Sequence, residues 1–143
     1  MSTTGYLSFD ATVEKTNRLL RTIEEAYGWP PNHRKQSYAA MRAVLHALRD
    51  RLTVQEAADL AAQLPMLLRG VFYEGWDPSR VPVKMSKEEF LARVRRDFPY
   101  DVEGGVRGLV RTVLNALQST VTEGEWDDIK SSLPKDLAVM VPA

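Results

Sequence analysis

Apolar residues recur every three or four positions through most of the chain, which is the spacing of one face of an α-helix. A first helix is predicted over residues 10–27, because Gly28 and the prolines that follow it end the pattern. Asn32 can cap a second helix with its side-chain oxygen. The second helix has the most regular apolar stripe, formed by Tyr38, Met41, Val44, Leu45, Leu48 and Leu52.

Capping signals mark the starts of later helices. In a capping box, a Ser or Thr hydroxyl accepts a hydrogen bond from the backbone three residues on, and the Glu at that position reaches back to the first N–H. Pro65 and Pro134 suit the first turns of two short helices, and Asp101 is expected to cap the long helix that follows it. Residues 74–85 lack helical spacing and predict an extended connection. Three capping boxes are predicted: Thr53 with Glu56, Ser86 with Glu89, and Thr122 with Glu125.

The second half of the chain repeats the first. The stretch TVQEAADLAAQLP at residues 53–65 recurs as TEGEWDDIKSSLP at residues 122–134, an offset of 69 residues. At this offset, residues 30–72 and 99–141 share twelve identities in 43 aligned positions, and most of these are caps, helix breakers or apolar residues. The identities in the first half are Pro30, Arg42, Val44, Leu45, Ala47, Leu48, Thr53, Glu56, Asp59, Leu64, Pro65 and Leu68.

The repeat predicts an all-α fold of about eight helices, arranged as two similar four-helix units around one core and related by a pseudo-twofold axis. Unit one spans about residues 9–73, a linker spans residues 74–85, and unit two spans about residues 86–141. A unit of fewer than about 70 residues buries little apolar surface by itself. Both units are therefore expected to share one core in a single domain over residues 1–143.

Composition limits the function classes. Nineteen basic and nineteen acidic residues cancel, so no net charge steers the chain to nucleic acid or anionic lipid. The predicted third helix also lacks Arg and Lys side chains to reach base edges, which disfavours DNA binding. The chain has no cysteine, no apolar run long enough to span a bilayer and no secretion signal at its start. We therefore expect a cytoplasmic protein without a membrane partner or a disulfide.

No residue pattern predicts a catalytic, metal or cofactor site. The two histidines, His33 and His46, lack a third ligand at metal spacing, and His46 is expected to be a partly exposed surface side chain. An acidic group at residues 123–128 lies in a predicted first helical turn, where the helix dipole favours carboxylates. Ser131 and Ser132 have no nearby histidine to activate them. Enzymatic activity is left open and is not favoured.

Charged residues at equivalent places in the two halves predict structural ion pairs. Arg42 matches Arg111, and Asp59 matches Asp128. We expect each Arg to bond the Asp on the following helix of its own unit, and so to fix how the two helices pack. A functional role for these charges is the alternative.

Three aromatic residues are the candidates for an interaction surface. Tyr73 and Trp76 lie beside or in the linker and either pin it to the core or line a groove for a partner helix or peptide. Trp126 stands where the first unit has Ala57. The two units therefore differ at this point, and broken symmetry of this kind can create a single site.

The order of these signals resembles the bacterial family called domain of unknown function 2267. The resemblance covers nearly the whole chain and is most specific in EAADLAAQLPMLLRGVFYEGW and in SKEEFL, whereas the second copy is looser at Gly124 and Trp126. It implies a small, all-helical, usually soluble bacterial protein. It brings no established activity, cofactor or catalytic residue.

The function favoured by the sequence is a non-enzymatic protein-interaction or regulatory module that binds an unknown protein or a second copy of itself. The alternative is a small-ligand binder or enzyme that uses a crevice between the two units. A groove or flat apolar patch would indicate the first, whereas a deep pocket with converging polar groups would indicate the second.

Overall fold

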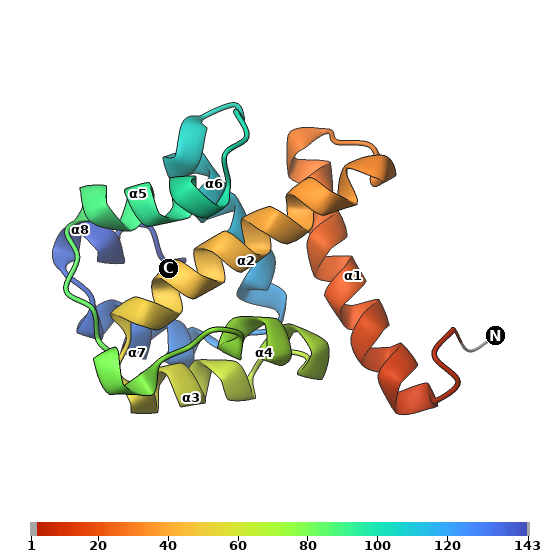
Figure 1. Ribbon diagram of the computed structural model, residues 1–143, viewed down its shortest axis with the longest axis horizontal. Helices are drawn as coiled ribbons and strands as arrows, with labels where there is room; N and C mark the ends of the chain where they lie inside the picture. The colour runs from red at the N-terminus through yellow and green to blue at the C-terminus, as the bar shows by residue number, and fades with distance from the viewer. Residues whose placement is uncertain (1–2, 143) are drawn as a thin grey trace.

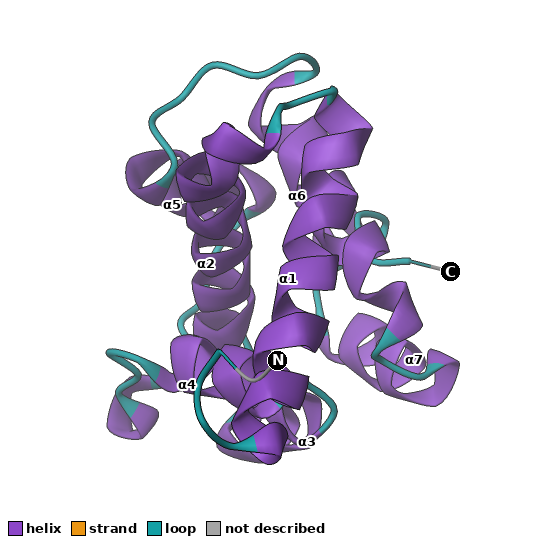
Figure 2. Ribbon diagram, turned by 90° about the vertical axis from the view of Figure 1, so that its right-hand side faces the viewer, coloured by secondary structure: helices purple, strands orange, loops and turns teal. Residues whose placement is uncertain are grey.

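The computed structural model describes residues 3–142 of the chain. Over these residues the chain forms eight α-helices and three short 3-10 turns, and it contains no β-strand (Figures 1 and 2). The predicted all-α class is therefore confirmed. None of these helices is long and apolar enough to cross a membrane. The helices are α1 (Leu7–Tyr27), α2 (Arg34–Arg51), α3 (Val54–Ala62), α4 (Met66–Tyr73), α5 (Lys87–Asp97), α6 (Gly105–Ala116), α7 (Glu123–Ser132) and α8 (Lys135–Ala138), and the 3-10 turns are η1 (Pro31–His33), η2 (Pro78–Arg80) and η3 (Leu117–Ser119).

Two of the three predicted capping boxes are complete. At α3 the Glu56 N–H donates to Thr53 Oγ1 at 3.2 Å, and the Thr53 N–H donates to Glu56 Oε1 at 2.9 Å. Ser86 and Glu89 make the same reciprocal pair at α5. α1 ends where predicted, since Gly28 adopts a left-handed conformation with φ of 66°. Local chemistry therefore sets these three boundaries.

Three helix starts differ from the prediction. α1 begins earlier than expected, at Leu7, and neither Asn32 nor Asp101 caps a helix, because Asn32 lies inside η1. The start of α6 is set instead by Gly104, whose φ of 82° is a conformation that residues with a side chain rarely adopt. Asp101 accepts a hydrogen bond from Arg95 at 3.2 Å.

α2 is the central helix of the fold and crosses the middle of the molecule (Figure 1). Residues 43–49 are all buried, so this stretch of α2 is covered on every side. The covering helices come from both halves of the chain: α1 and α4 from the first, and α5 and α6 from the second. The packing at Leu48 is an example: Leu48, Phe90 of α5 and Val110 of α6 line the same small cavity, whose volume is only about 10 Å³.

The apolar core is continuous across the two halves of the chain. Besides the contacts of α2, α1 packs on α6 and α3 packs on α7, and Figure 2 shows α1, α2 and α6 standing side by side. The two halves have the same order of helices, but α1 has 21 residues whereas α5 has 11. The internal repeat and its pseudo-twofold axis stay a prediction.

Polar side chains bond helices to one another near their ends. Glu24 in α1 is 3% exposed and accepts two hydrogen bonds from Arg34 at the start of α2, at 2.6 and 3.1 Å. Asp50 near the end of α2 bonds Arg93 of α5 at 2.9 Å. The backbone oxygen of Asp50 also accepts a hydrogen bond from the Val83 N–H of the linker at 2.7 Å. These contacts hold the linker and the second half of the chain against α2.

A chain that ends at Pro82 should not fold cooperatively, because it lacks α5 and α6, which cover part of α2. We expect a weak helical signal by circular dichroism, binding of a dye that detects exposed apolar surface, and no sigmoidal thermal transition. A cooperative melt of this shortened chain, or of residues 83–143 alone, would contradict a shared core.

Candidate functional site

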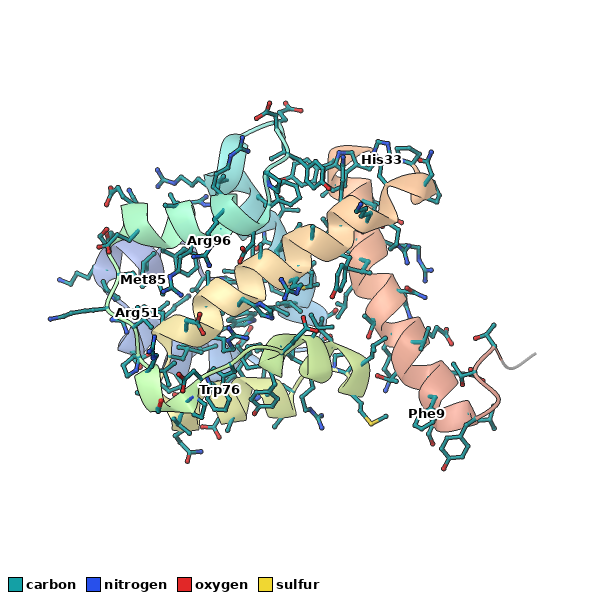
Figure 3. All side chains as sticks on the ribbon, in the orientation of Figure 1. Phe9, His33, Arg51, Trp76, Met85 and Arg96 are labelled. Carbon is teal, nitrogen blue, oxygen red and sulfur yellow. The ribbon has the colours of Figure 1, made fainter. Side chains whose placement is uncertain are left out.

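The three aromatic residues predicted to form an interaction surface do not come together on one. Tyr73 at the end of α4 and Trp76 in the following loop are half-buried against the core, with ring centres 5.2 Å apart (Figure 3). Trp126 of α7 is 2% exposed and is a core residue. The first two residues therefore fit the interpretation that they pin the linker, and Trp126 offers no surface to a partner.

The ion pairs in the structure are not those expected from the matched charges. Arg42 bonds Glu74 at 2.9 Å, because α2 packs beside α4 and Glu74 follows directly after α4. Asp59 does not pair with Arg42, because the helix that carries it, α3, packs on α7 instead. Arg111 and Asp128 are both exposed, and no ion pair joins them in the described part of the chain. The choice of neighbouring helix, rather than the matched sequence positions, therefore decides the pairing.

A polar crevice of about 240 Å³ lies between α2, the end of α4 and α5. His46 lines it, is 7% exposed, and forms a 2.7 Å hydrogen bond with the backbone oxygen of Val71. The expectation of a partly exposed surface histidine was therefore wrong, because α4 covers this side of α2. Burial and the nearby charges of Arg49 and Arg42 lower the pKa of His46, although the bond to Val71 opposes them. The imidazole is consequently neutral at pH 7.

Arg49 is buried next to this crevice and caps the C-terminal end of α4. Its guanidinium donates to the backbone oxygens of Phe72 and Glu74 at 2.9 and 2.8 Å, and to the carboxylate of Asp50 at 2.8 Å. Carbonyl groups at the end of a helix have no partner within the helix, so this buried cation satisfies them. The donors of Arg49 therefore serve the fold rather than a ligand.

A second crevice, of about 430 Å³, lies between α1, the end of α3 and η3. The basic side chains of Lys15 and Arg18 stand at its rim, and its floor includes the buried Leu19 and Leu64. No carboxylate is among the described residues that line it. Since α1 and α3 belong to the first half of the chain and η3 to the second, its position matches the inter-unit crevice of the small-ligand alternative.

Exposed apolar side chains gather where α1 and α4 begin. Their exposed fractions range from 45% to 79%. The Leu67 N–H donates to Thr12 Oγ1 at 2.8 Å, which holds the beginning of α4 against α1. In Figure 3, Phe9 marks the outer end of this region. The residues, here called the α1–α4 surface, are Tyr6, Leu7, Phe9, Met66 and Leu67.

Sequence reasoning missed the α1–α4 surface. The first helix was expected to begin at residue 10, so the apolar residues before residue 10 were not assigned to a face of any predicted helix. The available signal was the run of three apolar residues at 66–68, because a surface helix buries only one side. Leu68 is buried, with 1% of its surface exposed, whereas Met66 and Leu67 are exposed.

A second unusual region lies where α3 packs on α7 (Figure 2). Four of the acidic residues on the two helices are here called the α3–α7 seam, and the charges of the other three act on Glu125: Glu56, Asp59, Glu125 and Asp128. Asp59 and Asp128 are exposed, whereas Glu125 is 7% exposed. Burial, together with the negative charges of the other three, raises the pKa of Glu125 from 4.5 to about 7. Glu125 therefore holds a proton at pH values where most carboxyl groups are ionised.

The predicted capping box of Thr122 and Glu125 is only half formed. Thr122 Oγ1 accepts from the Glu125 N–H at 3.2 Å, but the Thr122 N–H donates to Gln63 Oε1 of α3 at 2.8 Å. No hydrogen bond reaches the Glu125 carboxyl group from residues 3–142. Burial also raises the pKa of Glu56, but hydrogen bonds led by the Thr53 N–H outweigh it and lower that pKa below 4.5. The pKa values of two glutamates at matched positions in the two halves therefore shift in opposite directions.

Residues 16–140, most of the chain, match the family described as "Uncharacterized conserved protein (DUF2267)". The chain belongs to this family. None of the curated proteins compared with this DUF2267 protein matches it.

The family match confirms the resemblance drawn from the repeated motifs, and it assigns no activity. The matched region of this DUF2267 protein contains α4 and the α3–α7 seam, whereas Tyr6, Leu7 and Phe9 lie before it. Across the part of the chain that the structure describes, no group of three or more His, Cys, Asp or Glu side chains is placed to hold a metal ion.

Replacing Arg49 by Met should destabilise this DUF2267 protein by about 2–4 kcal/mol, since the buried backbone oxygens of Phe72 and Glu74 would lose their donor. The control Arg42→Met removes a more exposed pair and should cost less than about 1 kcal/mol. Urea unfolding followed by circular dichroism measures both changes. Equal losses in the two variants would show that Arg49 has no special role at the end of α4.

Glu125→Gln should remove a pH-dependent loss of stability. The folded pKa of Glu125 is about 7 and its ordinary value is 4.5, so the folded state binds the proton more tightly and loses stability as the pH rises from 4.5 to 7. The shift corresponds to about 3 kcal/mol. Glutamine keeps the shape without the charge. The variant should therefore match its parent below about pH 4.5 and exceed it by about 3 kcal/mol near pH 8.

Urea unfolding at a series of pH values measures this difference. His46 contributes in the opposite direction, because its lowered pKa makes the folded state lose stability as the pH falls through 6.5. That contribution is common to parent and variant and cancels in the comparison. Glu88→Gln, an exposed change in the first turn of α5, is the control and should give no such trend. A difference that stays constant with pH for Glu125→Gln would mean that Glu125 ionises normally.

Proposed function

We propose that this DUF2267 protein is a non-enzymatic interaction module that docks another protein, or a second copy of itself, through the α1–α4 surface. One observation supports it: five of the eight large apolar side chains that are exposed within residues 3–142 belong to this surface. Single exposed apolar residues are common on soluble proteins, whereas a contiguous group of them is typical of an interaction site. The other three are Tyr38, Val54 and Val139.

The α1–α4 surface is suited to docking because it is both accessible and held in place. The first turns of α1 project beyond the rest of the molecule (Figure 1). The hydrogen bond between Thr12 and Leu67 fixes the two helix starts relative to each other, which reduces the ordering cost on binding. Burying one Leu or Phe side chain contributes about 1.5–3 kcal/mol. Five apolar residues are therefore enough to drive association if the partner covers them.

We also propose that the two halves are copies of one four-helix unit and share a single domain, with units over about residues 9–73 and 86–141 joined by a linker. The equal order of helices, and the packing of α1 on α6 and of α2 on α5, support this arrangement. The absence of cysteine from the sequence supports a reducing compartment such as the bacterial cytoplasm.

The second candidate function is binding of a small ligand in the crevice between α1, α3 and η3. Its volume of about 430 Å³ and its apolar floor with a basic rim support this alternative. The lining includes Lys15 and the hydroxyl groups of Ser119 and Thr120, but no hydrogen bond joins Lys15 to either hydroxyl within residues 3–142, so a binding role is better supported there than a catalytic one.

A photo-crosslinking amino acid at position 9, in place of Phe9, tests the interaction module. In cells that make the protein, irradiation should give a discrete cross-linked species, and its mass distinguishes a second copy from a different protein. Adding Leu67→Ser should lower the yield about tenfold, because it removes an apolar contact from the same surface. The matched control carries the probe in place of Val139, which is 61% exposed at the end of α8.

Absence of a discrete species from position 9, or the same species from both positions, would contradict docking through the α1–α4 surface. The crevice between α1, α3 and η3 would then be the better supported site.

A further inference from the structure

The polar crevice between α2, the end of α4 and α5 contains polar atoms that the fold itself does not use. Both halves of the chain build it, since α2 and α4 come from the first half and α5 from the second. Its volume is about 240 Å³. One water molecule occupies about 30 Å³ in the liquid, so this space equals that of about eight waters. The crevice therefore accommodates a small organic molecule.

His46 presents a hydrogen-bond acceptor to this crevice. Its Nε2 forms the 2.7 Å bond with the backbone oxygen of Val71, and a carbonyl oxygen only accepts, so Nε2 carries the proton of the neutral ring. The other ring nitrogen, Nδ1, then has a free lone pair. Within residues 3–142 Nδ1 has no hydrogen-bond partner, and it is not sealed from solvent. Because only 7% of His46 is exposed, the fold holds this nitrogen in a fixed position at the crevice.

Arg93 and Arg96 give the α5 wall of the crevice an excess of positive charge. They are three residues apart in α5, so both side chains leave the same face of the helix. The Asp50 carboxylate does not neutralise Arg93 alone, because it also accepts from Arg49, at 2.8 Å compared with 2.9 Å from Arg93. Within residues 3–142 Arg96 bonds only the neighbouring Asp97, at 3.4 Å.

The charges that line the crevice do not balance. Four guanidinium groups and three carboxylates line it, and the imidazole is neutral, so one positive charge is left over. Figure 3 places Arg96 between the ribbons of α5 and α2, on the side where His46 lines the same crevice. An anionic group near Arg93 and Arg96 would remove this imbalance.

We propose that this crevice binds a small hydroxycarboxylate, whose carboxylate lies against Arg93 and Arg96 and whose hydroxyl group donates to Nδ1 of His46. A guanidinium group is planar and offers several N–H donors, which matches the two oxygens of a carboxylate. The site is separate from the α1–α4 surface and from the crevice between α1, α3 and η3, and the proposal does not depend on either of them.

The two kinds of free group select this class of ligand. A carboxylate without a hydroxyl group leaves the acceptor on His46 without a donor, and an uncharged sugar leaves the extra positive charge in place. A metal ion or an amine is repelled by that charge. An α-amino acid has a donor and a carboxylate, but its ammonium group cancels the negative charge that the arginines attract. A hydroxycarboxylate satisfies both groups at once.

Long-range ¹H–¹⁵N NMR of the imidazole rings in the full chain tests the hydroxyl contact. The probes are racemic lactate and racemic glycerate, and propionate is the matched compound without a hydroxyl group. The chain has two histidines, so His33 is an internal reference. Near pH 8 either probe should move the Nδ1 signal of His46 and not that of His33. Lactate should bind about tenfold more tightly than propionate, which lacks the hydrogen bond to Nδ1.

Two variants separate the site from general attraction of anions. Arg96→Gln should lower the affinity for lactate about tenfold, since it removes a charged donor. The control Arg80→Gln makes the same charge change, because Arg80 also bonds a nearby Asp at 3.4 Å, but it lies in η2 outside the crevice and should bind as the parent does. In His46→Gln the amide can still donate to the backbone oxygen of Val71, but the acceptor at the position of Nδ1 is gone. This variant should bind lactate and propionate equally.

Several results would overturn the proposal. They are an unchanged His46 signal with both probes, equal affinity of the parent for lactate and propionate, and equal loss of affinity in Arg96→Gln and Arg80→Gln. None of these three depends on the folding of His46→Gln, which circular dichroism checks separately. Tighter binding of alanine than of lactate would assign the crevice to an α-amino acid. An equal response to inorganic phosphate would make it a general anion site, and the assignment to a hydroxycarboxylate would be wrong.

Discussion

Residues 43–49 of α2 are buried on every side, and a helix of this kind is stable only when several neighbours cover it. α1 and α4 provide part of the cover and precede or follow α2 closely in sequence, whereas α5 and α6 come from the second half of the chain. Small residues in α2, such as Ala43 and Ala47, let these neighbours approach closely. The positions of the linker and of Arg93 follow from this packing, since both bond Asp50 near the end of α2. The two halves therefore pack together because helices from both are required to cover α2.

The same local motif has different consequences at different places in this fold. α3, α5 and α7 all begin with Ser or Thr followed three residues later by Glu. At α3 and α5 the Glu bonds the backbone of its own helix. At α7 the side chain of Gln63 takes the Thr122 N–H, and Glu125 is left buried beside other carboxyl groups. Glu125 therefore makes no reciprocal capping bond, and burial and the neighbouring negative charges raise its pKa to about 7.

Much of the fold could be predicted from the sequence because its signals are local. Gly28 ends α1, Pro65 begins the short α4, and two capping boxes set helix starts through bonds that span only three residues. Periodic apolar residues likewise identify the buried face of each helix, whichever neighbour covers it. The all-α class and most of the core follow from these two kinds of signal.

The candidate sites could not be predicted in the same way, because they depend on which helices meet. Arg42 has acidic residues available at both Asp59 and Glu74, and only the packing of α4 beside α2 selects Glu74. His46 is buried by the same packing, although its sequence position suggested an exposed flank. The α3–α7 seam requires two helices that are far apart in sequence to pack face to face.

Native-state hydrogen exchange of the α2 amides tests most directly whether this helix depends on both halves. The amides of residues 43–49 should exchange with the same free energy as the slowest amides of α5 and α6, and this value should equal the free energy of global unfolding. Exchange of α5 and α6 through a smaller opening, while α2 stays protected, would contradict a core that the two halves complete together.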